Sequence, residues 1–137
     1  MPRTLVICKP DAVERRLTGE ILRRLETKGL RLVAAELRTI DAGTAASHYG
    51  EHERKPFYAE LVEFITRGPS LLVVVEGPGD DTWEVVRTLI GPTDPATAPP
   101  GTIRGDFGLQ VTENLIHGSD SRQSAQREID LFFPSLG

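Results

Sequence analysis

Residues 4–8 read TLVIC, a short run of apolar and β-branched side chains that is typical of a buried strand. Pro10 closes this run, and Asp11 opens a segment in which apolar residues recur every four positions, as on one face of a helix. Because a buried strand is followed at once by an amphipathic helix, we expect a layered fold in which helices pack on a sheet.

The first helix is expected to begin at Asp11 and to end at Gly29. Glu14 lies three residues after Asp11, which is the spacing of a capping box, and glycine is a common C-cap. The apolar stripe between these ends consists of Val13, Leu17, Ile21 and Leu25.

Three further strands are expected. Residues 71–75, LLVVV, are similar to the first strand and have turn residues on both sides. Residues 30–40 are mixed but strand-like, and a last strand ends near His117. Strands that alternate with helices favour an α/β sandwich.

The remaining helices are predicted from apolar spacing and turn residues. Pro56 fits the first turn of a helix that stops at Gly68, a weaker helix covers 81–89, and a final helix covers 124–133. Residues 91–101, GPTDPATAPPG, contain four prolines and predict an ordered or semi-rigid loop of a length that is often functional. The apolar face of the helix after Pro56 consists of Phe57, Leu61, Phe64 and Ile65.

Length and composition favour a single globular domain over residues 1–137. A chain of this length buries roughly two-thirds of its unfolded surface, and 26% charged with 39% hydrophobic residues is an ordinary globular mixture. The first residues lack the apolar run of a signal peptide, and no stretch approaches the ~20 apolar residues of a membrane span. Without an export signal or a membrane span, we expect a cytoplasmic protein without a membrane partner. Cys8 is the only cysteine, so no internal disulfide is expected.

The charge balance limits the classes of ligand that the protein is expected to bind. A formal net charge of −4 and a pI near 5.4 argue against a broad nucleic-acid interface, which needs a basic face. A small anionic ligand remains compatible, because a few arginines in one cleft can hold a phosphate on an otherwise acidic protein.

His117 is the first candidate for chemistry. It follows an apolar run and precedes a glycine, which places an imidazole at a strand end where a ligand can approach the backbone closely. Neutral imidazole is available near pH 7 and is a competent nucleophile toward a phosphoryl group. The ordinary alternative is a half-buried histidine at a strand edge.

Glu128 is the second candidate. It flanks the apolar stripe of the final helix, so its carboxylate needs a hydrogen-bond partner, and His117 is one plausible partner. A carboxylate on one ring nitrogen would fix the tautomer and leave the other nitrogen free to attack. The residues alone leave this role and that of a surface glutamate bordering the core equally open.

Residues 114–121, NLIHGSDS, resemble the signature of the nucleoside diphosphate kinase family, with eight consecutive residues that agree in type and order. The resemblance extends over almost the whole chain. Five further segments match in the family's order: TLVICKPDAV (4–13), HYGEHERKPFY (48–58), RTLIGPTDP (87–95), GTIRGDF (101–107) and SAQREIDLFF (124–133).

The resemblance implies a ferredoxin-like sandwich: a four-stranded antiparallel sheet with helices over one face, a helical hairpin and a long proline-rich loop. It also implies an enzyme that transfers the γ-phosphate of a nucleoside triphosphate, mainly ATP, to nucleoside diphosphates by a ping-pong mechanism. His117 is then the phosphate acceptor, Glu128 orients it, and Ser119 supports that contact. Phosphoryl transfer depends on positioning and charge stabilisation, which these residue types can supply.

Several residues match the family's contacts to phosphate and ribose. Arg87, Arg104 and Thr93 match phosphate-binding residues, and two guanidiniums can hold phosphate oxygens in a forked geometry. Lys9 matches a contact to the sugar and phosphate, and Asn114 matches the contact to the ribose hydroxyl. The ordinary alternatives are solvated surface arginines, a strand-end lysine and a turn asparagine.

Three ring side chains match the rest of the nucleotide site. Phe57 matches the base-stacking platform, and an aromatic face stacks on any base, which implies low base specificity. Tyr49 lies near the acceptor histidine in relatives. For both, a core aromatic residue is the ordinary alternative. His52 falls where some relatives have a phosphate contact and others an apolar residue.

Magnesium is expected to arrive with the nucleotide. The segment GPGDD, residues 77–81, is not followed by the Lys-Ser/Thr pair of a P-loop, and no carboxylate cluster predicts a metal cage. Mg²⁺ would therefore bridge nucleotide phosphates with few protein ligands.

Two other classes of protein would share parts of this pattern. A nucleotide-binding module without turnover would be expected to lack His117 or Glu128, and both are present. A ferredoxin-like RNA-binding domain would need aromatic pairs and a basic sheet face, whereas only 6% of this net-acidic chain is aromatic. The expected partners are nucleoside di- and triphosphates and further copies of the chain, since relatives are hexamers or tetramers built on a shared dimer.

Overall fold

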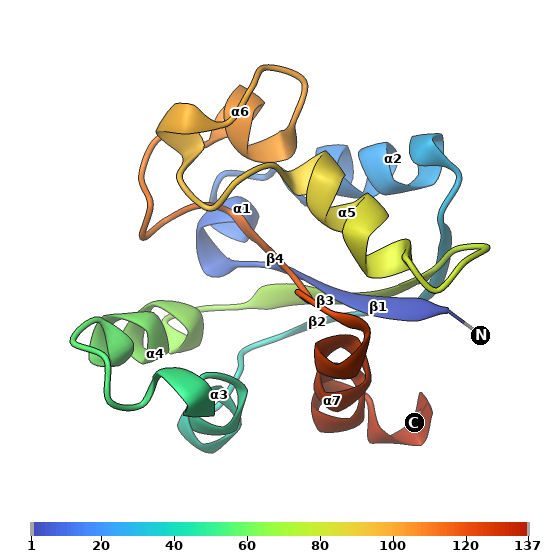
Figure 1. Cartoon of the computed structure of the whole chain (residues 1–137). Helices are drawn as coiled ribbons and strands as arrows, with labels where there is room; N and C mark the ends of the chain where they lie inside the picture. The colour runs from blue at the N-terminus through green and yellow to red at the C-terminus, as the bar shows by residue number, and fades with distance from the viewer. Residues whose placement is uncertain (1, 137) are drawn as a thin grey trace.

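The computed structural model describes residues 2–136 (Figure 1); Met1 and Gly137, the two ends of the expected domain, lie outside the described residues. Its centre is an antiparallel sheet of four strands in the order β2-β3-β1-β4. The strands expected at the start of the chain, at 30–40, at 71–75 and near His117 are all confirmed. They are β1 (Arg3–Cys8), β2 (Arg31–Arg38), β3 (Ser70–Glu76) and β4 (Ile116–Gly118).

The central strand β1 carries apolar side chains on both faces. Val6 and Cys8 point into one hydrophobic cluster, while Leu5 and Ile7 point into the other, as the alternation along a strand requires. β1 lies between β3 and β4, and Ile7 is paired with His117 across the β1–β4 ladder. A buried interior strand therefore fixes the position of the candidate histidine.

Helices cover both faces of this sheet (Figure 1). One layer consists of α1 (Pro10–Glu14), α2 (Thr18–Lys28), α5 (Thr82–Ile90) and α6 (Ile103–Phe107). The other consists of α3 (Ala42–His48), α4 (Tyr58–Thr66) and α7 (Arg122–Phe132). Short 3-10 turns are η1 (Gly50–His52), η2 (Pro95–Thr97) and η3 (Pro134–Leu136). The ferredoxin-like α/β sandwich is confirmed. The expectation that helices cover only one face is wrong, because the second face of the sheet is apolar as well and is covered by the hairpin α3–α4 and by α7.

The first helix is broken into two, contrary to the single helix expected from Asp11 to Gly29. α1 ends at Glu14, Arg16 adopts a left-handed backbone conformation with φ of 60°, and α2 begins at Thr18. Gly29 ends α2 with φ of 108°, so the predicted C-cap is confirmed.

The predicted capping role of Asp11 is wrong. Lys9 occupies the N-cap position without a side-chain cap, and the Asp11 carboxylate instead accepts a hydrogen bond from the backbone N–H of Leu115. Asp11 is buried. A buried acid needs a partner, and this partner comes from a distant part of the chain that helix periodicity does not reveal.

One helix begins later than expected, and one helix was not expected. α4 begins at Tyr58, two residues after Pro56, and Phe57 is its N-cap residue. α6 was not predicted at all; the Thr102 hydroxyl caps it by accepting from the Gly105 N–H at 3.0 Å. A helix of five residues is too short to display an apolar period.

Within residues 2–136, no helix is both long enough and apolar enough to cross a bilayer.

Candidate active site

A cavity of about 770 Å³ opens beside the end of β4, with walls from the hairpin α3–α4, from α5 and α6, and from the segment before His117. Ten of the eleven predicted site residues line it. These ten are Lys9, Tyr49, His52, Phe57, Arg87, Thr93, Arg104, Asn114, His117 and Glu128. Ser119, the eleventh, is fully buried beside Glu128. The structure thus gathers residues from both ends of the sequence around one opening.

His117 is held by Glu128, as the sequence suggested. His117 Nε2 lies 2.7 Å from Glu128 Oε1, and the same carboxylate oxygen accepts from the Ser119 hydroxyl at 2.8 Å. Burial raises the pKa of Glu128, but the hydrogen bond and the electrostatic interaction with His117 outweigh it, with smaller contributions from His48 and Ser119. The pKa therefore lies below its ordinary value. The charged carboxylate only accepts, so Nε2 carries the proton and Nδ1 retains its lone pair.

Local sequence sets this geometry. Ser121 caps α7 by accepting from the Ser124 N–H at 2.9 Å, which fixes the start of the helix that presents Glu128. Gly118 permits close packing of β4 on α5, because a Cβ there would lie 2.8 Å from Ile90 Cδ1. A side chain at position 118 would therefore displace the end of the Ile90 side chain.

Arg104 is a buried residue and not a solvated surface arginine. It is only 6% exposed, and its guanidinium donates to the carbonyls of Gly91 at 3.2 Å, Asn114 at 3.2 Å and Ile116 at 2.5 Å. Burial, with the nearby Arg87 charge, lowers the pKa of Arg104 to about 10. Such a guanidinium is fixed in place before any ligand binds.

Arg87 points toward the same region from α5. Its guanidinium donates to the carbonyl of Gly118 at 3.0 Å, one residue beyond His117. Arg87 is half-buried, in contrast to Arg104, and lines the cavity. The two guanidiniums supply positive charge on the side of the cavity where β4 ends.

Lys9, Asn114 and Thr93 form a hydrogen-bonded chain. Lys9 Nζ donates to Asn114 Oδ1 at 2.9 Å, and Asn114 Nδ2 donates to the Thr93 carbonyl at 3.1 Å. Burial, then the Arg104 charge, lowers the pKa of Lys9 to about 8. Lys9 and Asn114 are buried, so both side chains are held at the cavity wall and do not extend into solvent.

Leu115 connects this chain to His117 through an unusual backbone conformation. Its φ is 76°, a left-handed value that is rare for a residue with a side chain. Its N–H donates to Asp11 Oδ2 at 3.1 Å, and its carbonyl accepts from the Lys9 N–H at 2.8 Å. The corner between β1 and α1 therefore holds Leu115 on both sides.

The opposite wall of the cavity is aromatic. Phe57 is 42% exposed, and Lys55 Nζ lies 5.7 Å from its ring centre. The His52 ring lies 5.9 Å from Phe57 and 6.4 Å from Tyr49, so the three predicted rings adjoin one another. Burial and the Glu128 charge raise the pKa of Tyr49 to about 12, so its hydroxyl stays protonated. The exposure of Phe57 distinguishes it from a core residue.

Sequence reasoning missed His48, which lies against the predicted acceptor. The rings of His48 and His117 meet edge to face with their centres 4.8 Å apart. Burial, then the neighbouring His117, lowers the pKa of His48 to about 3, so this imidazole is neutral. The available signal was its place beside Tyr49 in the family-like segment 48–58.

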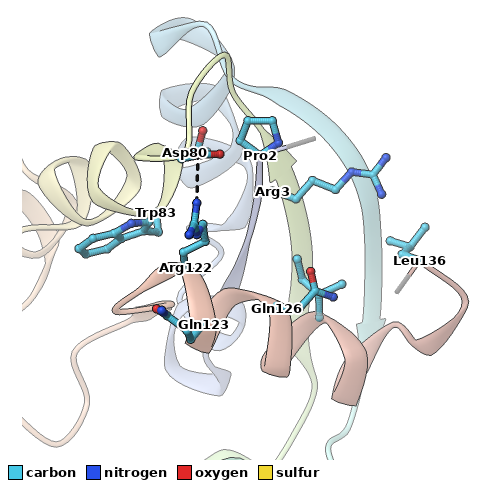
Figure 2. A pocket seen from close by; sticks show the side chains of 10 residues that line it. Pro2, Arg3, Asp80, Trp83, Arg122, Gln123, Gln126 and Leu136 are labelled. Atoms are coloured by element: carbon cyan, nitrogen blue, oxygen red, sulfur yellow. Dashed lines mark hydrogen bonds and ion pairs between the residues drawn. The ribbon is translucent and has the colours of Figure 1, made fainter.

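A second cavity, of about 650 Å³, lies where α5 and α7 begin (Figure 2). Trp83 and Gln123 line it, and Arg122 pairs with Asp80 at 3.1 Å across its edge, as Figure 2 shows. Both charged side chains are mostly exposed. This cavity has no hydrogen-bonded pair comparable to His117 and Glu128 among its described side chains, so it is the weaker candidate for chemistry.

A ferredoxin-like sheet with a carboxylate-bound histidine and clustered basic side chains at one cavity is the architecture of a phosphotransferase. The family model for nucleoside diphosphate kinase matches residues 2–136. The chain belongs to the nucleoside diphosphate kinase family.

Individual relatives agree with this assignment over their full lengths. The chain is 59% identical to a nucleoside diphosphate kinase of Parafrankia sp., over 98% of this chain and 96% of the relative. It is 58% identical to that of Thermobifida fusca, over 99% of both chains.

Solved structures show the same likeness. A family member from Babesia bovis superposes with a TM-score of 0.94 at 43% identity, covering 99% of this chain and 90% of the other. A Halobacterium salinarum nucleoside diphosphate kinase in complex with CDP superposes with a TM-score of 0.91 at 51% identity, covering 96% and 86% of the two chains.

Proposed function

We propose that the nucleoside diphosphate kinase activity of this chain proceeds through a phosphorylated His117. The observation that carries the proposal is the 2.7 Å contact of His117 Nε2 with the Glu128 carboxylate, which leaves the Nδ1 lone pair as the nucleophile. Nδ1 attacks the γ-phosphorus of a nucleoside triphosphate, and the bond from that phosphorus to the bridging oxygen breaks. The diphosphate leaves, a second diphosphate enters, and its terminal oxygen takes the phosphoryl group from Nδ1.

The basic side chains bind and orient the phosphates in this proposal. Arg104 and Arg87 approach the end of β4 from α6 and α5, and Lys9 approaches from the end of β1. Charge that is fixed in a partly dehydrated cavity stabilises a transition state more than the same charge free in water. Thr93 and Asn114 extend the same wall toward the sugar.

Glu128 also stabilises charge during the reaction. As Nδ1 bonds to phosphorus, positive charge develops on the ring, and the carboxylate on Nε2 offsets it. Ser119 keeps that carboxylate in place by donating to the same oxygen. His117 therefore needs no rearrangement to become a phosphoramidate.

Low base specificity follows from the aromatic wall. Phe57 offers an exposed ring face, and stacking does not depend on the pattern of hydrogen-bond groups at the base edge. The relative that was solved with CDP supports a pyrimidine nucleotide as one acceptable ligand. His52 is adjacent to Phe57 and completes the entrance.

Mg²⁺ would enter this site bound to the nucleotide phosphates. Within residues 2–136, the side chains whose potential ligand atoms converge are His48, His117 and Glu128, a set with two imidazoles. Mg²⁺ prefers oxygen ligands in octahedral geometry, so this set does not suit it. The phosphate oxygens of the nucleotide would supply its ligands, and bound Mg²⁺ would neutralise phosphate charge.

We also propose a cytoplasmic homo-oligomer, hexameric or tetrameric as in the family. Leu109 is 85% exposed and Leu37, on the edge strand β2, is 59% exposed, so apolar side chains remain to be covered by further copies. Sedimentation equilibrium tests this part, and a monomer at micromolar concentration would contradict it.

Incubation with ATP that is radiolabelled at the γ-position tests the central proposal. The protein should acquire label that is lost in acid and retained in base, as a phosphoramidate is, and peptide mapping should place it on His117. Adding unlabelled diphosphate should remove the label as triphosphate. Label that survives acid and maps to Ser119 or Ser121 would refute the mechanism.

A further inference from the structure

His48, His117 and Glu128 bring three potential metal ligands together from three separate elements. One ligand atom from each residue lies within 4.8 Å of the others. α3 supplies His48, β4 supplies His117 and α7 supplies Glu128. In the phosphotransfer mechanism only His117 and Glu128 have roles, so the third side chain is unexplained.

His48 has an unused ring nitrogen in this cluster. The residue is 4% exposed, and its Nδ1 is buried without a hydrogen-bond partner. An unpaired buried polar atom costs about 1–3 kcal/mol, so its persistence requires a reason. The ring also packs edge to face on His117, with the two ring centres 4.8 Å apart.

The donor set matches zinc and not magnesium. Two imidazoles and one carboxylate form a common zinc ligand set, which leaves a fourth position for water. Tetrahedral ligands with bonds of ~2.0–2.2 Å stand about 3.3–3.6 Å apart. The present ligand atoms lie within 4.8 Å of one another, and His117 Nε2 and Glu128 Oε1 are 2.7 Å apart. Small side-chain rotations would therefore bring the His48 nitrogen nearer and move the other two atoms apart to this spacing.

We propose that His48, His117 and Glu128 form a binding site for Zn²⁺, and that bound Zn²⁺ prevents His117 from accepting a phosphoryl group. The ion replaces the proton between His117 Nε2 and Glu128 Oε1, which are 2.7 Å apart. That proton moves through solvent to Nδ1, because a neutral imidazole with a metal on Nε2 carries its hydrogen on the other nitrogen. Nδ1 then has no lone pair for the attack.

Access to the site comes from the cavity. His48, His117 and Glu128 all line it, and the His117 side chain is 22% exposed. The phosphate-binding side chains lie outside the ligand set, so Zn²⁺ should block the chemical step while nucleotide binding persists. The proposal has two halves, zinc binding and inhibition of phosphorylation. The inhibitory half rests on the proposed role of His117, whereas the binding half does not.

Calorimetry with zinc chloride and the nucleotide-free full chain tests the binding half. We expect one Zn²⁺ per chain, and we expect His48→Gln to weaken binding at least about tenfold, the loss typical of removing even a supporting group. His52→Gln is the matched control, since it removes another imidazole from the same cavity wall; its zinc affinity should equal that of the wild type. Equal affinities of wild type and His48→Gln would overturn the site.

Co²⁺ tests metal binding on the wild-type protein, so the test does not depend on whether His48→Gln folds. Co²⁺ added to the wild-type protein should give the intense visible absorption of a four-coordinate ion, and Zn²⁺ should displace it. The pale spectrum of hydrated Co²⁺ alone would overturn the proposal.

Phosphoenzyme formation tests the inhibitory half. Protein loaded with one equivalent of Zn²⁺ and freed of excess metal on a desalting column is mixed with Mg²⁺ and γ-labelled ATP. Labelling should be slowed at least about tenfold relative to zinc-free protein, and EDTA should restore it. Equal labelling rates would overturn inhibition, whereas failure of the zinc-free protein to label would instead contradict the proposed function.

Discussion

The carboxylate of Asp11 accepts a hydrogen bond from the backbone N–H of Leu115, 104 residues further along the chain, at 3.1 Å. Leu115 has a φ of 76° and stands between Asn114 and His117. One side chain at the start of α1 therefore holds the backbone that carries both a proposed ribose contact and the proposed acceptor.

Asp11→Ala should lower the free energy of unfolding by about 1–3 kcal/mol, because the Leu115 N–H loses its acceptor in a buried position. The rate of phosphoenzyme formation should fall as well, since Asn114 and His117 are less well held. Asp11→Asn is the matched control, as its amide oxygen can still accept. Urea unfolding and γ-labelled ATP measure the two effects, and equal stability of the two variants would contradict this role.

Glu128→Gln should slow phosphoenzyme formation about 10- to 100-fold, since a hydrogen bond to a charged group contributes about 1.5–3 kcal/mol. Asp130→Asn is the control, because Asp130 lies two residues away on α7 and faces solvent. Rapid-quench labelling distinguishes the chemical step from nucleotide binding. A Glu128→Gln protein that labels at the wild-type rate would remove Glu128 from the mechanism.

Arg87→Ala and Arg104→Ala should both reduce kcat/KM, but they should differ in stability. Arg104 donates to three backbone carbonyls, so its loss should cost at least about 2 kcal/mol of unfolding free energy. Arg87 donates to one carbonyl, so its loss should cost about 1 kcal/mol. Near-normal activity in both variants would mean that the phosphate binds elsewhere.

Nucleotide affinity should fall as pH rises through about 8, because Lys9 then loses the charge that would face the phosphates. The pKa of Lys9 in the folded chain is about 8 against an ordinary 10.5, so between these values the unfolded chain binds more protons. The contribution of Lys9 to the free energy of unfolding therefore rises over this window.

Titration calorimetry with ADP at pH 7 and pH 9 measures the change in affinity. Lys9→Met, which cannot titrate, provides the control and should bind weakly at both pH values. An unchanged wild-type affinity across the window would contradict a charged Lys9 at the phosphate.

Phe57→Ala should weaken binding of purine and pyrimidine diphosphates alike, by about 1–3 kcal/mol. Stacking removes ring surface from water and does not depend on the hydrogen-bond groups at the edge of the base, so all bases should lose affinity alike. Comparing KM for ADP, GDP, CDP and UDP in wild type and variant measures the loss. A loss confined to one base would show that Phe57 discriminates between bases.

The sequence was sufficient for those parts of the fold and site that local pattern encodes. Buried strands appear as β-branched runs, and a carboxylate beside an apolar stripe signals a buried partner, which is how Glu128 was connected to His117. The roles of Lys9, Asn114 and Phe57 came only from the resemblance, since each has an ordinary structural explanation on its own.

Long-range contacts explain what sequence reasoning did not find. Asp11 had the spacing of a helix cap, but its partner Leu115 is 104 residues away in the sequence. The place of His48 beside Tyr49 did not reveal its contact with His117, because the two rings meet only in the folded chain, 69 positions apart in the sequence. Arginine is usually exposed, so the burial of Arg104 could not be read from its position in the chain.

The burial of Arg104 has a consequence for how this enzyme can change over time. Its guanidinium joins the carbonyl of Gly91, at the end of α5, to those of Asn114 and Ile116, in the segment that leads into β4. A substitution that removes the proposed phosphate contact therefore also loosens the scaffold. Drift toward a catalytically silent but well-folded descendant is then more accessible through His117, whose loss leaves these two segments joined, than through Arg104.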